Sequence, residues 1–569
     1  MQQARGFEED LPTQLEYYDE HQGDSSIAHV LPRSRFRTVL LSALRIAGIC
    51  LLLLLSTAFG FGFNGAFPLL AFLQVALAQL LLLHAHPDRR HESWWWTVSK
   101  FFLLWLCLTF AYSFGFAGSF RFDPEDASRS YAIVLGICAV VCLGLALLVH
   151  LPFYRAWTRF QDQSNALGLL LLSLVLPTLY TTYWFLIQRL LPIGDFVHPA
   201  YSQLSFHSFI MFAAFFGLSG VAFVMCWSSF ALFCVGWSEL RGNDEEERKK
   251  RFLLMIAVAT IVLVGACTCG SFQALAASGN FYQKDIARDS IVQQQFKVGC
   301  IINGDYQATK QLLTKSNSNE AGEKPYSFVL WSEGSTSLWS GQQDTFLPEL
   351  QDLARETQTV LLPAFMNGTK NMLALINERG ELLYTYQKRH PVPGEGITPG
   401  PGVIHTATTG VGAIAAAVCF DLNFPHYISD QVSKEAQLLA QPSETWGPIG
   451  EYHAGTNAVR SIEHGFVLVR CSSEGYSGVF SPDGKWSQLV PDGTSGVYSM
   501  VAPSRPRRVF TLYDAIGDVF AWFCVALSAV YVVGLVFMPT SVLRRIPHKW
   551  LQRSAAGWSI AGREREHLL

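Results

Sequence analysis

Charged residues are scarce in this 569-residue sequence. Asp, Glu, Lys and Arg together make up 15% of it, against about 25% in an ordinary soluble protein. Half of the residues are hydrophobic, and the mean hydropathy is positive at +0.23. This composition favours a membrane protein. The net charge of −3 is small, and no long basic stretch with interleaved aromatics occurs, so nothing indicates a nucleic-acid partner.

Cysteines that could form disulfides are also few. Nine of the twelve cysteines lie in apolar runs, and only Cys300, Cys419 and Cys471 fall in the polar part of the chain. This distribution predicts no disulfide framework. The N-terminal segment lacks the short apolar core and small-residue cleavage site of a signal peptide. Its polar, acidic composition predicts a disordered tail over residues 1–36, and we expect a second tail over residues 541–569.

The sequence does contain a series of apolar runs near the ~20 residues that cross a bilayer. The eight runs are Val39–Phe59, Ala66–Ala85, Val98–Gly118, Tyr131–Leu151, Ala166–Ile187, Phe206–Val235, Phe252–Ala276 and Ile516–Met538. Buried helices of a large soluble protein would show polar faces that these runs lack. We therefore predict about seven transmembrane helices over residues 37–280 and a last one over residues 513–540.

Lysine and arginine are distributed unevenly between the loops. Basic residues occur just before the first run at 33–37, between the sixth and seventh runs at 241–251, and after the last run at 544–553. The positive-inside rule then places both termini in the cytoplasm. It places the polar region 281–512 on the opposite side, in a periplasm or secretory lumen. Asn367-Gly368-Thr369 is a glycosylation sequon in this region and adds a little weight to a lumenal position.

The polar region alternates strand and helix patterns. Short apolar runs bounded by turn residues predict strands. The predicted strands are Phe296–Ile302, Val360–Phe365, Met372–Ile376, Leu382–Tyr386, Gly412–Val418 and Phe466–Cys471, and the predicted helices are Leu347–Thr357 and Ala454–His464. Together they indicate one α/β domain of about 230 residues, an ordinary size for a domain.

One strand of this domain ends at a cysteine. The stretch Val411–Tyr427 reads VGAIAAAVCFDLNFPHY, so an apolar, small-residue run leads into Cys419 and a polar turn follows. At the exit of a strand, backbone N–H groups come free and can stabilise an oxyanion. Cys419 is therefore a candidate nucleophile, although a lone cysteine is more often a buried structural residue.

Two upstream stretches supply partners for this cysteine. In YSFVLWSEGS, Glu333 lies just past an apolar strand. In LYTYQKRHPVPGEG, Lys388 again follows a strand and Glu395 lies in a Pro/Gly turn. Taken singly, these residues would be read as solvated loop glutamates and a surface lysine. Because ligands of open α/β folds gather at the ends of strands, they could instead converge with the cysteine at one rim of a sheet.

Such a group of side chains has a coherent chemistry. A buried carboxylate takes the thiol proton, while a nearby ammonium lowers the thiol pKa and favours the thiolate. The same ammonium, together with the N–H that follows the cysteine, can hold an oxyanion. The pattern predicts nucleophilic catalysis through an acyl-enzyme. A histidine-assisted cysteine is the alternative, and none of its candidates stands out by context: His390, His405, His426, His453 and His464.

Three ordered motifs carry a resemblance to a known family. WSEG, YQKRHPVPGEG and VCFDLNFPHY resemble the Glu–Lys–Cys motifs of the nitrilase (carbon–nitrogen hydrolase) superfamily, and the resemblance covers most of residues 296–512. It implies an α/β nitrilase-type domain with a four-layer αββα sandwich. It also implies the following roles: Glu333 as the base, Lys388 as the oxyanion stabiliser, Cys419 as the nucleophile, Glu395 as a supporting carboxylate and the N–H of Phe420 as the second oxyanion donor.

The predicted membrane bundle indicates which branch of this superfamily the chain resembles. About seven spans, an extracytoplasmic nitrilase-like domain and one last span resemble the apolipoprotein N-acyltransferases. That resemblance implies a phospholipid as acyl donor, a thioester on Cys419, and a lipid-modified protein or another amine as acceptor. It implies no metal and no other cofactor. An acyl donor that diffuses in the bilayer would explain why a catalytic domain carries a multispan bundle.

Two other functions stay open. Cys419-Phe420-Asp421 resembles the extracellular pantetheinase and biotinidase branch of the superfamily, which hydrolyses amides. The chain could therefore be a membrane-tethered amidase with water as the acceptor. A third hypothesis is a transporter or scaffold with a decayed nitrilase domain, against which the complete set of Glu, Lys and Cys argues.

Overall fold

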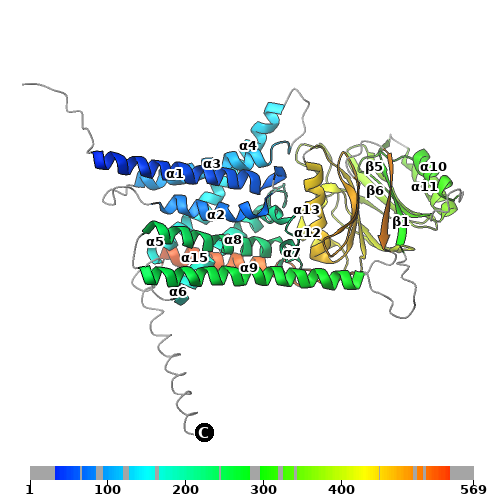
Figure 1. The fold of residues 1–569 in the computed structure, drawn as a ribbon. Helices are drawn as coiled ribbons and strands as arrows, with labels where there is room; N and C mark the ends of the chain where they lie inside the picture. The colour runs from blue at the N-terminus through cyan, green and yellow to red at the C-terminus, as the bar shows by residue number, and fades with distance from the viewer. Residues whose placement is uncertain are drawn as a thin grey trace, which may run out of the picture.

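The computed structural model describes most of the chain between Arg33 and Phe537. The described residues are 33–64, 67–84, 94–119, 127–160, 166–241, 245–281, 295–317, 325–338, 342–447, 449–490, 496–503 and 508–537. A helical bundle comes first, an α/β domain follows, and a final helix returns to the bundle (Figure 1). Helix α1 already begins at Arg33, inside the predicted N-terminal tail. Residues 1–32 and the predicted C-terminal tail lie outside the described residues.

The bundle consists of apolar helices, as expected where lipid offers no partners to the backbone and each segment must satisfy its own hydrogen bonds. Its helices are α1 (Arg33–Gly60), α2 (Pro68–Leu83), α3 (Trp94–Gly115), α4 (Ala127–Leu145) continued by η4 (Ala146–His150) and α5 (Leu151–Phe160), α6 (Ala166–Leu190), α7 (His207–Ile210), α8 (Ala213–Arg241), α9 (Glu245–Phe281) and α15 (Val519–Phe537). Six stretches of the described helices are long and apolar enough to cross a membrane, while α2 and α15 are shorter apolar helices. Each of the eight predicted runs thus contains a helix, and the number of spans stays a prediction.

The sixth predicted run, Phe206–Val235, is not one continuous helix. A short helix α7 precedes α8, and α8 itself is kinked at Gly217, which has a left-handed backbone with φ +63°. A Cβ atom at Gly217 would lie 2.6 Å from the ring of Tyr513, just before the final helix. A glycine is visible in the sequence here, but the close approach of that distant ring is not, so the kink could not be predicted from the apolar run.

The α/β domain contains two sheets. Its strands are β1 (Gln295–Ile302), β2 (Tyr326–Trp331), β3 (Thr336–Leu338), β4 (Val360–Leu362), β5 (Ala364–Asn367), β6 (Lys370–Ile376), β7 (Leu382–Gln387), β8 (Thr406–Thr409), β9 (Gly412–Ala416), β10 (Leu438–Glu444), β11 (Val467–Ser473), β12 (Ser477–Phe480), β13 (Trp486–Val490) and β14 (Gly496–Pro503). The first sheet runs in the order β14-β1-β2-β4-β6-β5-β3, with β7 paired to β6, and the second runs β13-β12-β11-β10-β9-β8.

Helices cover the outer face of each sheet. Helices α10 (Tyr306–Asn317) and α11 (Gln343–Thr357) contact the first sheet, and α13 (Ile449–His464) contacts β11 and β12 of the second. The sheets face each other through β1 against β11 and β2 against β10. The prediction of a helical membrane bundle joined to a four-layer αββα domain is therefore confirmed, and Figure 1 shows α13 on the side of the domain that faces the bundle.

A disulfide joins the two sheets. Cys300 in β1 and Cys471 in β11 are bonded, with their Cα atoms 5.4 Å apart. The sequence predicts no disulfide framework, and this single bond is a pairing that the prediction missed. The two cysteines are 171 residues apart, and only the stacking of the sheets brings them together.

A buried charge network holds the domain to the bundle. Arg460 of α13 contacts Asp195 at 3.3 Å and Glu463 at 3.1 Å, and all three side chains are buried. Asp195 lies in the loop that follows α6. Glu463 also accepts a hydrogen bond of 3.2 Å from the backbone N–H of Leu218 in α8. The guanidinium of Arg460 therefore contacts one carboxylate from the bundle and one from the α/β domain.

Candidate active site

The end of β7 brings the predicted lysine against both predicted glutamates. Lys388 Nζ donates to Glu333 Oε1 at 2.7 Å and to both oxygens of Glu395 at 2.9 Å. Glu333 lies in the turn after β2, and Asn371 Nδ2 also donates to it, at 2.7 Å. Lys388 is completely buried. Burial alone would lower its pKa, but Glu333, Cys419 and Glu395 outweigh that effect and raise it, so the side chain is an ammonium.

Cys419 begins the 3₁₀ helix η6 (Cys419–Asn423), three residues after the end of β9. Its φ is +45°, in the left-handed region that side chains other than glycine rarely adopt. Such conformations cluster at functional sites, where the surrounding structure enforces them. The thiol donates to the carbonyl of Glu444 at 3.4 Å, and the N–H of the same Glu444 donates to Glu333 at 3.0 Å. A single residue of β10 thus lies between the candidate nucleophile and the candidate base.

The electrostatics of the thiol differ from the sequence prediction. Burial raises the pKa of Cys419 to about 12, and the negative charge of Glu333 acts in the same direction. Lys388 does lower this pKa, as predicted, but its effect is outweighed. The net shift of the pKa therefore favours the protonated thiol over the thiolate. A base must remove that proton as the sulfur attacks.

Asp421 is a site residue that the sequence reading used only for its resemblance to a family motif. Its buried carboxylate accepts from the backbone N–H groups of Arg389 at 3.1 Å and His390 at 2.7 Å, and from the hydroxyl of Tyr386 at 2.6 Å. It also accepts from the N–H of Val418 at 3.2 Å. Asp421 thus fastens the chain around Lys388 to the turn that carries Cys419. In the sequence, the acidic residue two positions after Cys419 was the one feature that could have predicted this role.

Three of the candidate histidines are engaged by residues other than Cys419. His390 contacts Asp421 and stacks on Phe424, and His464 contacts Asp514. His453 is bonded to Asn423 at 2.8 Å. Within the described part of the chain, no hydrogen bond joins a histidine to the sulfur of Cys419. The geometry therefore favours the Glu–Lys–Cys arrangement over a histidine-assisted cysteine.

An apolar cavity connects Cys419 with the bundle. It encloses about 710 Å³ of space between atoms, part of which is open to solvent. Its lining comes from the bundle and the loop after α6 (Phe116, Ser119, Val134, Ile137, Cys138, Ile193, Phe196, Val197) and from the α/β domain (Val392, Pro393, Cys419, Phe420, Glu444, Thr445, Trp446, Ile449, His453). The candidate nucleophile therefore faces a hydrophobic space whose other wall is formed by the membrane part of the protein.

The loop after α6 fixes the position of the cysteine turn. The N–H of Asp195 donates to the carbonyl of Asn423 at 2.8 Å, and Asn423 Nδ2 donates back to Asp195 at 3.1 Å. Gly194 has φ +55°, and a Cβ there would lie 2.2 Å from the same carbonyl, so only glycine fits. The cavity wall contributed by the bundle is thus held in register with the turn that carries Cys419.

Comparisons with known proteins find relatives of the α/β domain. Residues 300–501 match the family model of carbon-nitrogen hydrolases. The chain is 29% identical over 226 residues to an apolipoprotein N-acyltransferase of Gloeobacter violaceus, which covers 35% of this chain and 42% of that relative. It is 31% identical over 94 residues to a human deaminated glutathione amidase, covering 15% of this chain and 29% of the amidase.

Among solved structures, an amidase from Nesterenkonia sp. AN1 is 18% identical and has a TM-score of 0.32, with 37% of this chain and 91% of that chain covered. The chain spans less than half the length of the two curated relatives described above. Similarity is concentrated in the domain that carries Glu333, Lys388 and Cys419. Residues 300–501 of this chain therefore form a carbon–nitrogen hydrolase, or nitrilase-type, domain, and apolipoprotein N-acyltransferases are among the relatives of the chain.

Proposed function

We propose that this protein is a membrane N-acyltransferase that moves an acyl chain from a phospholipid, through a thioester on Cys419, to an amine. The cavity between Cys419 and the bundle carries this proposal, because it gives an acyl chain an apolar place that reaches from the membrane part to the thiol. A small polar amide would need no such wall. The relatives named apolipoprotein N-acyltransferase support the same reading.

The first half-reaction forms the thioester. Glu333 takes the proton of Cys419, and the sulfur attacks the ester carbonyl of the phospholipid. Lys388 and the N–H of Phe420 stabilise the oxyanion, while Glu395 holds Lys388 in place. Collapse of the tetrahedral intermediate breaks the ester C–O bond, and Glu333 returns the proton to the leaving lysophospholipid. An amine then attacks the thioester and regenerates the thiol.

The proposed orientation places the catalytic domain outside the cytoplasm. The uneven distribution of basic residues between the loops puts both termini in the cytoplasm. The disulfide between Cys300 and Cys471 supports this orientation, because disulfides form and persist in oxidising compartments. With about seven spans before the domain and one after it, residues 281–512 then face a periplasm or secretory lumen.

Filling the cavity tests the proposal. Ile137 of α4 lines the cavity, and we expect Ile137→Trp to reduce lysophospholipid release from long-chain phospholipids roughly tenfold or more, because a single misfit of this kind can cost about 10²-fold. Val140→Trp is the matched control: Val140 lies on the same helix but is 72% exposed, toward the lipid. Equal release by both variants, with a short-chain substrate turned over normally, would contradict the role of the cavity.

A membrane-tethered amidase is the second candidate. Cys419-Phe420-Asp421 and the similarity to a deaminated glutathione amidase favour it. It predicts that ammonia or an amine is released from small amides in the absence of lipid. Cavity-filling at Ile137 would then leave the release of ammonia unchanged, which separates the two candidates.

A further inference from the structure

Glu444 is the last residue of β10 and is fixed beside the reacting groups by its own main chain. Its N–H donates to Glu333 at 3.0 Å and its carbonyl accepts from the thiol of Cys419 at 3.4 Å. Glu444 keeps exposed surface, unlike the six preceding residues of the strand, although its carboxylate is partly buried. Glu444 also belongs to the lining of the cavity that holds Cys419. The carboxylate of Glu444 therefore lies where an acceptor molecule would approach a thioester on Cys419.

This carboxylate is available for a substrate. Among the described residues, no hydrogen bond or ion pair engages it, while Lys388 is already shared between Glu333 and Glu395. Burial and the neighbouring carboxylates of Glu333, Glu474 and Glu395 raise the pKa of Glu444, against a smaller opposing effect of Lys388. The surroundings therefore carry surplus negative charge, which attracts a cation and makes Glu444 a better proton acceptor.

The proton balance of the second half-reaction requires such a group. An α-amine is largely an ammonium at neutral pH, since its ordinary pKa is about 8. Its nitrogen carries three protons; the amide product keeps one and the sulfur of Cys419 takes one as the C–S bond breaks and the N–C bond forms. The third proton must leave. Glu333 is buried and already accepts from Lys388, Asn371 and the N–H of Glu444, so it has no direct exit to solvent.

We propose that Glu444 binds the acceptor as an ammonium and takes its first proton, which it then passes to solvent. The inference rests on the proposed function and names the acceptor chemistry: a cationic primary amine in place of water or a neutral nucleophile. Glu333 returns the other proton to the sulfur. Glu444 thereby sets which nucleophile resolves the acyl-enzyme.

Two nucleophiles that differ in protonation test this role. The acyl-enzyme, formed by the full-length protein with phospholipid in detergent, is chased at pH 7 with glycinamide, largely a cation, or with hydroxylamine, largely neutral. Loss of the acyl mass is followed by intact mass spectrometry. In Glu444→Gln, we expect the ratio of the glycinamide rate to the hydroxylamine rate to fall roughly tenfold or more, as for loss of a general base.

Raising the pH to about 10, above the α-amine pKa, should restore the ratio in Glu444→Gln, because the amine then arrives without its extra proton. Glu451→Gln, at an exposed acid of α13, is the matched control and keeps the wild-type ratio. An unchanged ratio in Glu444→Gln, or a ratio that stays low at high pH, overturns the inference while leaving the thioester intact. Absence of any acyl-enzyme in the wild type instead overturns the proposed function, and this inference with it.

Discussion

Replacement of Lys388 by methionine is expected to slow the acylation of Cys419 by about 10³-fold, the cost of losing an oxyanion donor. Lys388 is the buried cation that contacts both Glu333 and Glu395, at 2.7 and 2.9 Å. Methionine fills a similar volume but donates no hydrogen bond, and it leaves two carboxylates facing each other without a counter-charge. The variant therefore loses stabilisation of the oxyanion, and the proton transfer from the thiol of Cys419 also becomes less favourable.

The rate of acyl-enzyme formation, followed by intact mass, measures this effect. Lys370→Met is the matched control, because Lys370 is an exposed lysine on β6 of the same sheet. We expect the control to acylate at the wild-type rate. Acylation of Lys388→Met within tenfold of the wild type, in folded protein, would show that Lys388 does not stabilise the oxyanion.

Arg460→Met is expected to destabilise the catalytic domain by about 3–5 kcal/mol, because it leaves buried carboxylates without their partner. Asp195, from the loop after α6, and Glu463, on α13, both depend on this guanidinium. For a domain of this size the loss corresponds to a fall of roughly 10 °C in Tm. Because Asp195 also holds the carbonyl of Asn423 beside the cysteine turn, acylation should decline with it.

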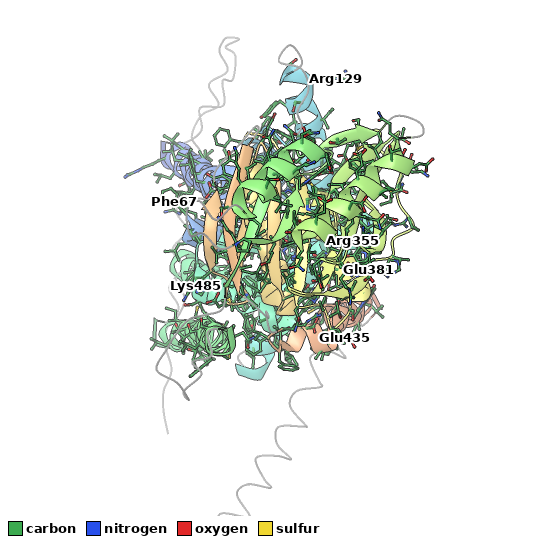
Figure 2. The ribbon with its side chains drawn as sticks, turned by 90° about the vertical axis from the view of Figure 1, so that its right-hand side faces the viewer. Phe67, Arg129, Arg355, Glu381, Glu435 and Lys485 are labelled. Carbon is green, nitrogen blue, oxygen red and sulfur yellow. A yellow bond between two sulfur atoms is a disulfide. The ribbon has the colours of Figure 1, made fainter. Side chains whose placement is uncertain are left out.

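A pair on the opposite face of the domain provides the comparison. Arg355 contacts Asp352 at 2.7 Å on the surface, with both side chains more than half exposed, and Figure 2 shows Arg355 on the outer side of the domain. We expect Arg355→Met to change stability by less than about 1 kcal/mol. If Arg460→Met and Arg355→Met lowered the free energy of unfolding by similar amounts, the buried network around Arg460 would contribute no more to stability than a surface ion pair.

The same network gives stability a dependence on pH. Burial raises the pKa of Asp195 to about 6 and that of Glu463 to about 8. Both groups bind their protons more tightly in the folded chain, so their stabilising effect is full below about pH 4 and is lost as the pH rises through 6 and then 8. The Tm of the wild type should therefore fall between about pH 4 and about pH 8, most steeply below about pH 6, where both groups contribute. Glu463→Gln, which cannot titrate, should show a smaller fall.

Features determined by local sequence were predictable. An apolar run followed by a polar turn fixes where a strand ends, and this placed Glu333, Lys388 and Cys419 at strand exits before any fold was known. The sheets then bring Lys388 into contact with Glu333 and Glu395. Helix content in the eight apolar runs was predictable for the same reason, since length and composition alone set it.

Features that arise from distant contacts were not predictable. The disulfide partners Cys300 and Cys471, the kink of α8 against Tyr513, and the protonated state of Cys419 all depend on how separate elements pack. The cavity wall is a further case. Ile137 and Val140 are both apolar residues of α4, and nothing in a uniformly apolar run distinguishes the one that lines a cavity from the one that is exposed.

The mass of Cys419 after exposure to a defined phospholipid tests the central claim most directly. Purified full-length protein is incubated with one phospholipid species, and its intact mass is measured beside a Cys419→Ala variant. We predict an added mass equal to one acyl chain, removed by hydroxylamine and absent from the variant, because a thioester forms only on that sulfur. A folded wild-type protein that gains no acyl mass, yet releases ammonia from small amides, would contradict acyl transfer.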